Sequence, residues 1–121
     1  MSKTILAIDD DPSILFILRN LLEYEGYKVY TLAKGDHVFE EIYNHPPDLI
    51  LLDVMLAGMD GRDICKSIKE KPETHDIPVI LISGTHHLED TLKQQGAPDD
   101  FLAKPFNIGV LLHKIEDQLA A

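Results

Sequence analysis

The sequence predicts an α/β fold, a doubly wound parallel sheet of five strands with helices on both faces. Strand-like and helix-like stretches alternate along the chain, and a new unit begins roughly every 25 residues, close to the size of a βα repeat. Residues 49–52 are four consecutive aliphatic residues, which is typical of a central strand buried on both faces. Because crossovers between parallel strands are right-handed, few arrangements remain, and the strand order 2-1-3-4-5 is expected.

The expected strands are short apolar runs bounded by turn residues. The first and third are largely aliphatic, and the second alternates between apolar and polar residues. Pro78 lies at the entry of the fourth strand, where a missing N–H group is tolerated. The five strands are expected at residues 4–8, 27–32, 48–53, 77–82 and 100–103.

The expected helices lie between these strands and carry start and stop signals. Asp11 is a capping residue followed by Pro12 at the first helical position, and this helix is expected to end near Gly26. Asn107 is the expected cap of the last helix, whose apolar residues are spaced along one face. The other helices are expected to open at residues 34–36 and end before the prolines at 46 and 47, to cover 61–71, and, with few apolar anchors, to cover 87–95.

Length and composition indicate one compact domain spanning residues 1–121. The chain has 121 residues, of which 45% are hydrophobic, enough for a core without covalent staples. Its single cysteine, Cys65, excludes an internal disulfide and fits a reducing compartment. Cys65 lies between Ile64 and Ile68, so we interpret it as a small buried hydrophobic residue.

The charge and the N-terminal segment restrict where the protein acts. The apolar run before Asp9 is too short for a signal peptide or a membrane span, so we expect a cytoplasmic protein without a membrane partner. The net charge is −10, with 21 acidic and 11 basic residues. Binding to a phosphate backbone requires a basic patch, and direct contact with nucleic acid is therefore not expected.

Three carboxylates are expected at one edge of the sheet. Asp9 and Asp10 follow the first strand and Asp53 ends the third, and these strands are neighbours in the expected order. Converging carboxylates repel each other unless a cation lies among them, and oxygen ligands with water suit Mg²⁺. Asp11 is explained by its capping role. For Asp53, the alternative is that it caps the turn after its strand.

The next two strand ends add groups that suit a phosphoryl group. Ser83, Gly84 and Thr85 follow the fourth strand, and Lys104 follows the fifth. A metal ion and a lysine neutralise phosphoryl oxygens, and a hydroxyl group can hydrogen-bond one of them. The sequence has no Walker loop and no dinucleotide-binding fingerprint, so we expect covalent attachment with Asp53 as the nucleophile.

The chain resembles the response-regulator receiver domains of two-component signalling, of the chemotaxis-regulator kind, over essentially its whole length. This family has the flavodoxin-like fold that the alternation of strands and helices predicts. The resemblance rests on four motifs in order: ILAIDDDP at 5–12, DLILLDVML at 48–56 with GMDG at 58–61, IPVILISG at 77–84, and FLAKPF at 101–106.

The resemblance implies a phosphorylation-dependent switch. Asp53 would accept a phosphoryl group from a phosphohistidine on a sensor histidine kinase or a histidine phosphotransfer protein. Asp10, Asp53 and the backbone carbonyl of Met55 would ligate Mg²⁺, and Asp9 would act through water. Lys104 and Ser83 would bind the phosphoryl oxygens.

The resemblance also implies roles for residues around Asp53. Gly84 would leave an open approach for the donor imidazole, and Thr85 would tune the access of water. Phe101 would change rotamer as Ser83 moves, and the bond between Lys104 and Pro105 would be cis, which only X-Pro bonds reach at low cost. The output partner is not implied.

The chain departs from the family pattern at a few positions, and two other functions compete. Ala57 stands where the family often has proline, Phe101 replaces a frequent tyrosine, and Pro98 is an extra proline. One alternative is a degenerate receiver that serves as a docking module. The other is an aspartyl-phosphate phosphatase, whereas a receiver is not an enzyme for external substrates and catalyses only its own phosphorylation and dephosphorylation.

Overall fold

The computed structural model describes residues 2–84 and 96–121 and contains the expected parallel sheet. Its order is β2-β1-β3-β6-β7, and every neighbouring pair is parallel. This confirms the predicted fold class and the predicted order, since β6 and β7 are the fourth and fifth strands of the sheet. The strands are β1 (Thr4–Ile8), β2 (Lys28–Leu32), β3 (Leu49–Asp53), β6 (Val79–Ser83) and β7 (Asp100–Ala103).

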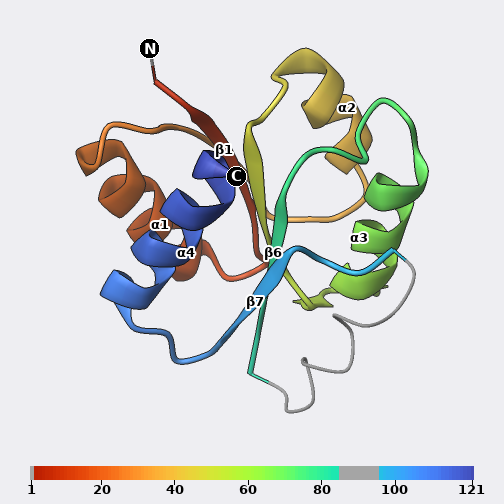
Figure 1. The fold of residues 1–121 in the computed structure, drawn as a ribbon. Helices are drawn as coiled ribbons and strands as arrows, with labels where there is room; N and C mark the ends of the chain where they lie inside the picture. The colour runs from red at the N-terminus through yellow and green to blue at the C-terminus, as the bar shows by residue number, and fades with distance from the viewer. Residues whose placement is uncertain (1, 85–95) are drawn as a thin grey trace.

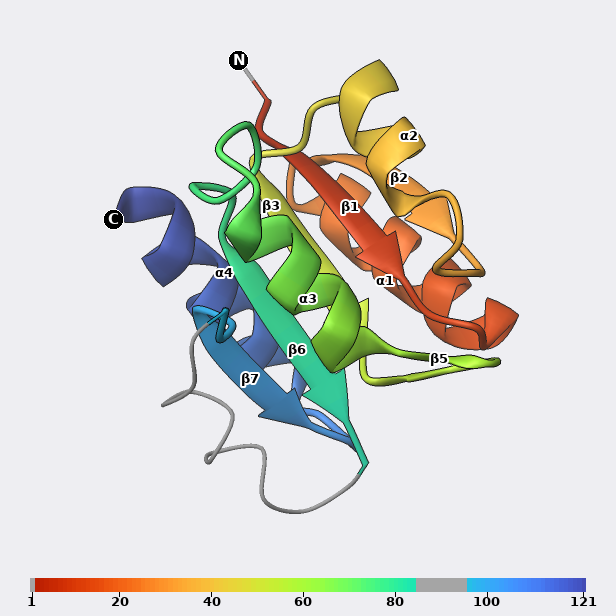
Figure 2. The same cartoon turned by 90° about the vertical axis from the view of Figure 1, so that its right-hand side faces the viewer.

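Four described helices cover the two faces of the sheet. Helices α1 and α4 lie on one face, and α2 and α3 lie on the other (Figures 1 and 2). The expected helix at residues 87–95 lies outside the described residues. None of the described helices has the length and apolar character needed to cross a membrane. The helices are α1 (Pro12–Tyr24), α2 (Val38–Asn44), α3 (Gly61–Glu70) and α4 (Ile108–Ala120).

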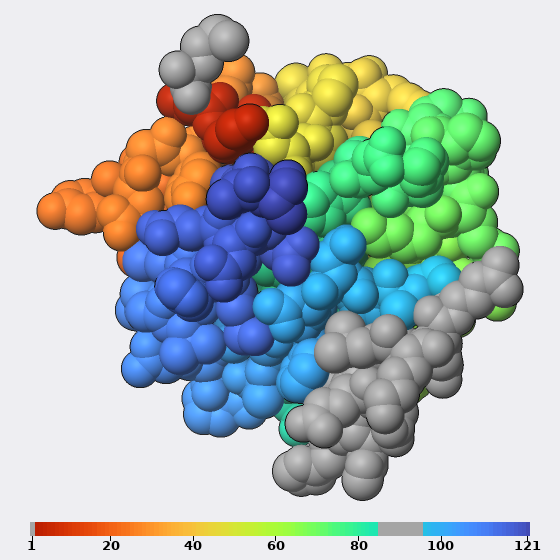
Figure 3. Space-filling view, viewed as in Figure 1, coloured from red at the N-terminus to blue at the C-terminus, as the bar shows by residue number. Residues whose placement is uncertain are grey.

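The core has two parts, one on each face of the sheet. All five residues of β3 are buried, as the aliphatic run predicted. Successive residues of a strand point to opposite faces, so Ile50 and Leu52 pack toward α2 and α3 while Leu49 and Leu51 pack toward α1 and α4. In the space-filling view, side chains close the gaps seen between the ribbons around α4 (Figure 3).

The predicted caps of the first and last helices are confirmed. The carboxylate of Asp11 accepts a hydrogen bond from the Ser13 backbone N–H at 2.9 Å, and Pro12 occupies the first turn of α1. The side chain of Asn107 accepts from the Val110 N–H at 3.1 Å at the start of α4. These contacts satisfy N–H groups that have no partner within the helix.

Three sequence-based boundaries were wrong or incomplete. The segment after β3 is a small antiparallel hairpin of β4 (Met55–Leu56) and β5 (Met59–Asp60), which was expected to be a loop. Helix α2 begins at Val38 and not at residues 34–36, where buried Gly35 packs closely against Ile64 and Met59. Strand β6 begins at Val79, two residues later than expected, because Pro78 has no N–H group for the ladder.

Candidate functional site

The carboxylates of Asp9, Asp10 and Asp53 meet at the carboxyl ends of β1 and β3. These strands are hydrogen-bonded neighbours, with Ile8 opposite Leu52, so the acids that follow them come together. One oxygen from each carboxylate lies within 4.8 Å of the other two. Asp9 and Asp53 are 2% and 4% exposed, whereas Asp10 is exposed, so the cluster opens to solvent on one side.

Lys104 reaches this cluster from the end of β7. Its Nζ lies 2.9 Å from Oδ2 of Asp9 and 3.3 Å from Oδ2 of Asp53. The backbone N–H of Lys104 donates to the carbonyl of Ser83 at 2.8 Å, which fixes the start of this segment against β6. The peptide bond between Lys104 and Pro105 is cis, as predicted. Residues 95 positions apart in the sequence therefore share one ion-pair network.

The charges at this edge are unbalanced. Burial and the neighbouring charge of Asp9 raise the pKa of Asp53, and Lys104 only partly opposes them. Burial works to lower the pKa of Lys104, but hydrogen bonds and charge from Asp9 and Asp53 outweigh it, and the pKa rises. One ammonium group faces three carboxylates. The excess of oxygen donors and negative charge fits a hard divalent cation such as Mg²⁺, held by the chain's own carboxylates.

The backbone around Asp53 is tightly supported. Oδ1 of Asp53 accepts from the Met55 N–H at 3.3 Å, and Oδ1 of Asp9 accepts from the Asp11 N–H at 2.9 Å. Gly61, the first residue of α3, donates its N–H to the Val54 carbonyl at 2.8 Å. A Cβ atom at Gly61 would overlap the carbonyl oxygen of Asp53. The chain therefore needs glycine at this position to pass behind the acid.

The remaining predicted residues lie at nearby strand ends. Ser83 is fully buried at the end of β6, which pairs with β3 through Asp53 and Ile82. Gly84 is exposed, and a Cβ atom there would meet no atom of the described residues within 4 Å. The predicted role of Thr85 lies outside the described residues. Phe101 is partly buried against the core on the α2 and α3 face.

Two features of the site were missed in the sequence. The hairpin of β4 and β5 carries Met55, which is 63% exposed beside the cluster. Its turn is the pair Ala57 and Gly58, and the only signal was Gly58, which has a positive φ of 75° that glycine adopts at low cost. The close contact between Gly61 and the backbone of Asp53 depends on the path of another strand, so no local pattern in the sequence indicates it.

Comparisons with known proteins agree with this geometry. The model of the family described as "Response regulator receiver domain" matches residues 5–116. A CheY-like receiver domain protein from Methanospirillum hungatei is 30% identical, with a TM-score of 0.89 and coverage of 99% of this chain and 95% of that chain. The receiver domain of a signal transduction histidine kinase from Syntrophus aciditrophicus is 30% identical, with a TM-score of 0.88 and coverage of 98% and 91%.

A third similar structure has been solved in an activated form. It is the BeF3-activated N-terminal receiver domain of RstA from Klebsiella pneumoniae, which is 26% identical with a TM-score of 0.85. The match covers 98% of this chain and 99% of that chain. The chain belongs to the response regulator receiver domain family of two-component systems. Receiver domains interact with histidine kinases or phosphotransfer proteins and bind Mg²⁺ through acidic residues.

Proposed function

We propose that this chain is a phosphorylation-activated switch of a cytoplasmic two-component phosphorelay, with Asp53 as the acceptor. The observation that carries the proposal is the meeting of Asp9, Asp10, Asp53 and Lys104 at one edge of the sheet. Asp9 and Asp53 each accept a backbone N–H group and contact Lys104, but one acid would neutralise this lysine, so an ion pair alone does not account for three carboxylates. An acceptor carboxylate with a cation site and an ammonium group beside it accounts for all four.

In the proposed reaction, a carboxylate oxygen of Asp53 attacks the phosphorus of a phosphohistidine. A P–O bond forms as the P–N bond breaks, and the electron pair of that bond leaves with the imidazole. Lys104 already lies 3.3 Å from the acceptor carboxylate, so its ammonium group can move onto a transferred phosphoryl oxygen. Bound Mg²⁺ supplies charge neutralisation for the phosphoryl oxygens.

The other residues take supporting roles. Asp10, Asp53 and the Met55 carbonyl would hold the metal, and Asp9, which pairs with Lys104 and orients it, would act on the metal through water. The hydroxyl of Ser83 binds a phosphoryl oxygen. Gly84 would leave an approach for the donor imidazole, and its support is that a Cβ atom there would meet no atom of the described residues within 4 Å.

Phosphorylation shifts an equilibrium between two conformations of Ser83 and Phe101, which changes the output surface. The donor is a sensor histidine kinase or a histidine phosphotransfer protein, and the reader of the output surface is a protein partner. The chain turns over no external substrate and catalyses only its own phosphorylation and dephosphorylation. Its acidity supports an output that does not contact nucleic acid directly.

The test is phosphorylation of the whole chain by acetyl phosphate, followed by intact-mass spectrometry. We expect the mass of one phosphoryl group, gained only with Mg²⁺ present and lost in Asp53→Asn. Asp76→Asn is the matched control, since this carboxylate is 93% exposed and outside the cluster, and it should be modified as the natural chain is. A native chain that gains no mass contradicts the proposal.

The same preparation separates the alternatives. Steady hydrolysis of a small phosphoester such as p-nitrophenyl phosphate, dependent on an aspartate of the cluster, would indicate an aspartyl-phosphate phosphatase. A Mg²⁺ titration followed by NMR tests the docking-module alternative. Resonance shifts centred on Asp10 and Asp53 support the switch, and their absence supports a degenerate receiver.

A further inference from the structure

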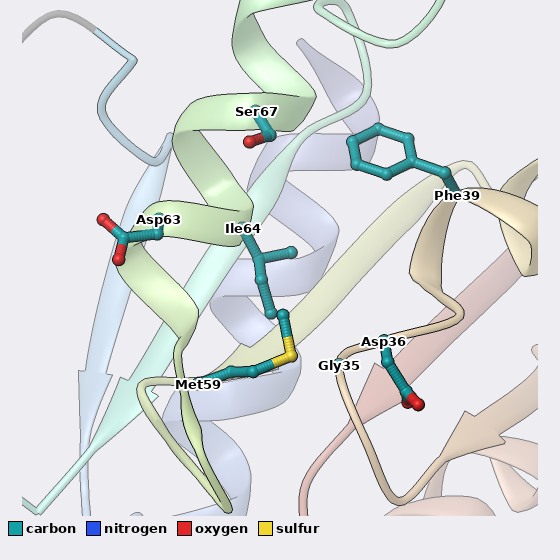
Figure 4. A pocket seen from close by; sticks show the side chains of 7 residues that line it. All are labelled: Gly35, Asp36, Phe39, Met59, Asp63, Ile64 and Ser67. Carbon is teal, nitrogen blue, oxygen red and sulfur yellow. The ribbon is translucent and has the colours of Figure 1, made fainter.

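A pocket of about 240 Å³ lies between α2 and α3, away from the carboxylate cluster. Its centre is formed by the side chains of Phe39, Met59 and Ile64 (Figure 4). Gly35 forms part of the wall and leaves room for Ile64 and Met59, because a Cβ atom there would lie 2.6 Å from Cδ1 of Ile64. The pocket is thus a shallow apolar depression between two helices.

Two carboxylates flank this apolar centre. Asp36 precedes α2 and Asp63 lies in the first turn of α3, and Figure 4 shows them on opposite sides of Ile64 and Met59, pointing outward. Among the described residues, no lysine or arginine lines the pocket. The ammonium group of Lys71 lies beside the pocket, with its Nζ 4.1 Å from the centroid of the Phe39 ring.

The size and openness of the pocket decide what kind of occupant it suits. Sites for small organic ligands have volumes of roughly 300–1,000 Å³ and enclose most of the ligand. This pocket is smaller and open, so it suits one side chain of a larger molecule. Tyr43 supports a polypeptide occupant, because it lies one helical turn beyond Phe39 and is 56% exposed. A bound polypeptide could extend onto this ring.

We propose that this pocket binds a partner polypeptide in which an apolar side chain lies between two basic residues. The apolar side chain fills the centre at Phe39, Met59 and Ile64, and the basic residues face Asp36 and Asp63. Charge complementarity selects this occupant, because the chain carries a net charge of −10 and the pocket rim carries two acids. In an extended segment, residues two positions apart share a face, so the matching pattern is basic-x-apolar-x-basic.

The pocket is also joined to the acceptor loop. Met59 pairs with Leu56 across the hairpin, and this hairpin begins two residues after Asp53. A partner bound here would therefore touch the segment that follows the acceptor. Binding itself requires neither phosphorylation nor Mg²⁺, so the inference stands apart from the proposed function.

The test uses the unphosphorylated full chain and the capped peptide Arg-Ser-Leu-Ser-Arg, followed by amide shifts in two-dimensional NMR. We expect saturable shifts at residues 35–39 and 59–67, with a dissociation constant on the order of 1 mM. In one control peptide Leu is replaced by Ser, and in the other both Arg residues are replaced by Glu. Neither control peptide should cause these shifts in the protein. No shift at about 10 mM peptide overturns the proposal.

Variants on the protein side separate this site from general attraction to an acidic chain. Asp36→Asn with Asp63→Asn should weaken binding by roughly fivefold, as expected for two exposed ion pairs. The matched control Asp76→Asn with Asp117→Asn removes the same charge elsewhere and should leave the affinity unchanged. Equal weakening in both double variants, or shifts centred on another face, would contradict the proposal.

Discussion

The ion-pair networks at the two ends of the sheet differ in their balance of charge. At the carboxyl end, Lys104 contacts two acids of a three-carboxylate cluster, and the site opens to solvent at Asp10. At the amino end, Lys69 is 13% exposed and pairs with one acid, Asp99, at 2.6 Å. The first network is left with excess negative charge, and the second is balanced.

The amino-end network fastens several segments together. Nζ of Lys69, on α3, donates to the Ile77 carbonyl at 2.8 Å and to the His75 carbonyl at 3.3 Å. Oδ2 of Asp99 also accepts from the Val79 N–H at 2.8 Å. The entries to β6 and β7 are thus tied to one helix. The comparison indicates that the balanced network at the amino end stabilises the fold, while the carboxyl end holds uncompensated negative charge.

The largest loss of stability is expected from a substitution of Gly61, which lies against the backbone of Asp53. Gly61→Ala places a Cβ atom on the carbonyl of Asp53, so we expect the free energy of unfolding to fall by about 3 kcal/mol or more. Urea denaturation measures this. Gly84→Ala is the control at the same end, because its Cβ atom meets no atom of residues 2–84 and 96–121 within 4 Å, and an equal loss there would refute the steric argument.

Removing the lysine of the balanced network should also destabilise the chain. Lys69→Met leaves the Ile77 carbonyl and Asp99 without this donor, and we expect a loss of about 2 kcal/mol in urea denaturation. Phosphorylation by acetyl phosphate should be retained below the unfolding transition. Lys3→Met, at an exposed position, should change stability by less than about 0.5 kcal/mol, and a matching loss there would remove the contrast.

Removing the charge of Asp53 from the unbalanced network should raise the free energy of unfolding, whereas the two substitutions above lower it. The raised pKa of Asp53 means that the folded chain holds this proton more strongly than the unfolded chain. Its stabilising contribution is therefore present at acidic pH and is lost as pH rises above the ordinary value of 3.8. In Mg²⁺-free buffer at pH 7, Asp53→Asn should stabilise the fold by about 1 kcal/mol.

The difference for Asp53→Asn should vanish at acidic pH, and added Mg²⁺ should stabilise the natural chain more than the variant. Chemical denaturation at several pH values, with and without Mg²⁺, measures both effects. If Asp53→Asn is less stable than the natural chain at pH 7, repulsion among the carboxylates at the carboxyl end does not destabilise the fold.

The effect that is absent at neutral pH and appears only in alkaline solution concerns Cys65, which lies in α3. Burial raises the pKa of this thiol from 9.0 to about 11. The unfolded chain therefore loses this proton at lower pH than the folded chain, and stability should fall between pH 9 and 11 by up to about 1.4 kcal/mol per pH unit. Cys65→Ala should lack this slope, and an unchanged slope would assign it to another group.

The predictability of the site follows from where its residues lie in the sequence. Asp9 and Lys104 directly follow apolar strands and Asp53 ends one, so strand order alone predicted that they meet at one edge. The sequence could not show that Lys104 contacts both Asp9 and Asp53, since that depends on distances across the sheet. Lys69 and Asp99 were overlooked because neither lies at a strand end on the carboxyl side.

The sequence by itself determined the alternation of strands and helices, the burial of β3 and the caps at Asp11 and Asn107. These depend on periodicity and on contacts within a few residues, which a linear chain displays directly. Only the tertiary structure decided the need for glycine at Gly61, the late start of α2 and the pocket between α2 and α3. Each depends on the close approach of segments far apart in the chain, and the packing that brings them together has no local pattern in the sequence.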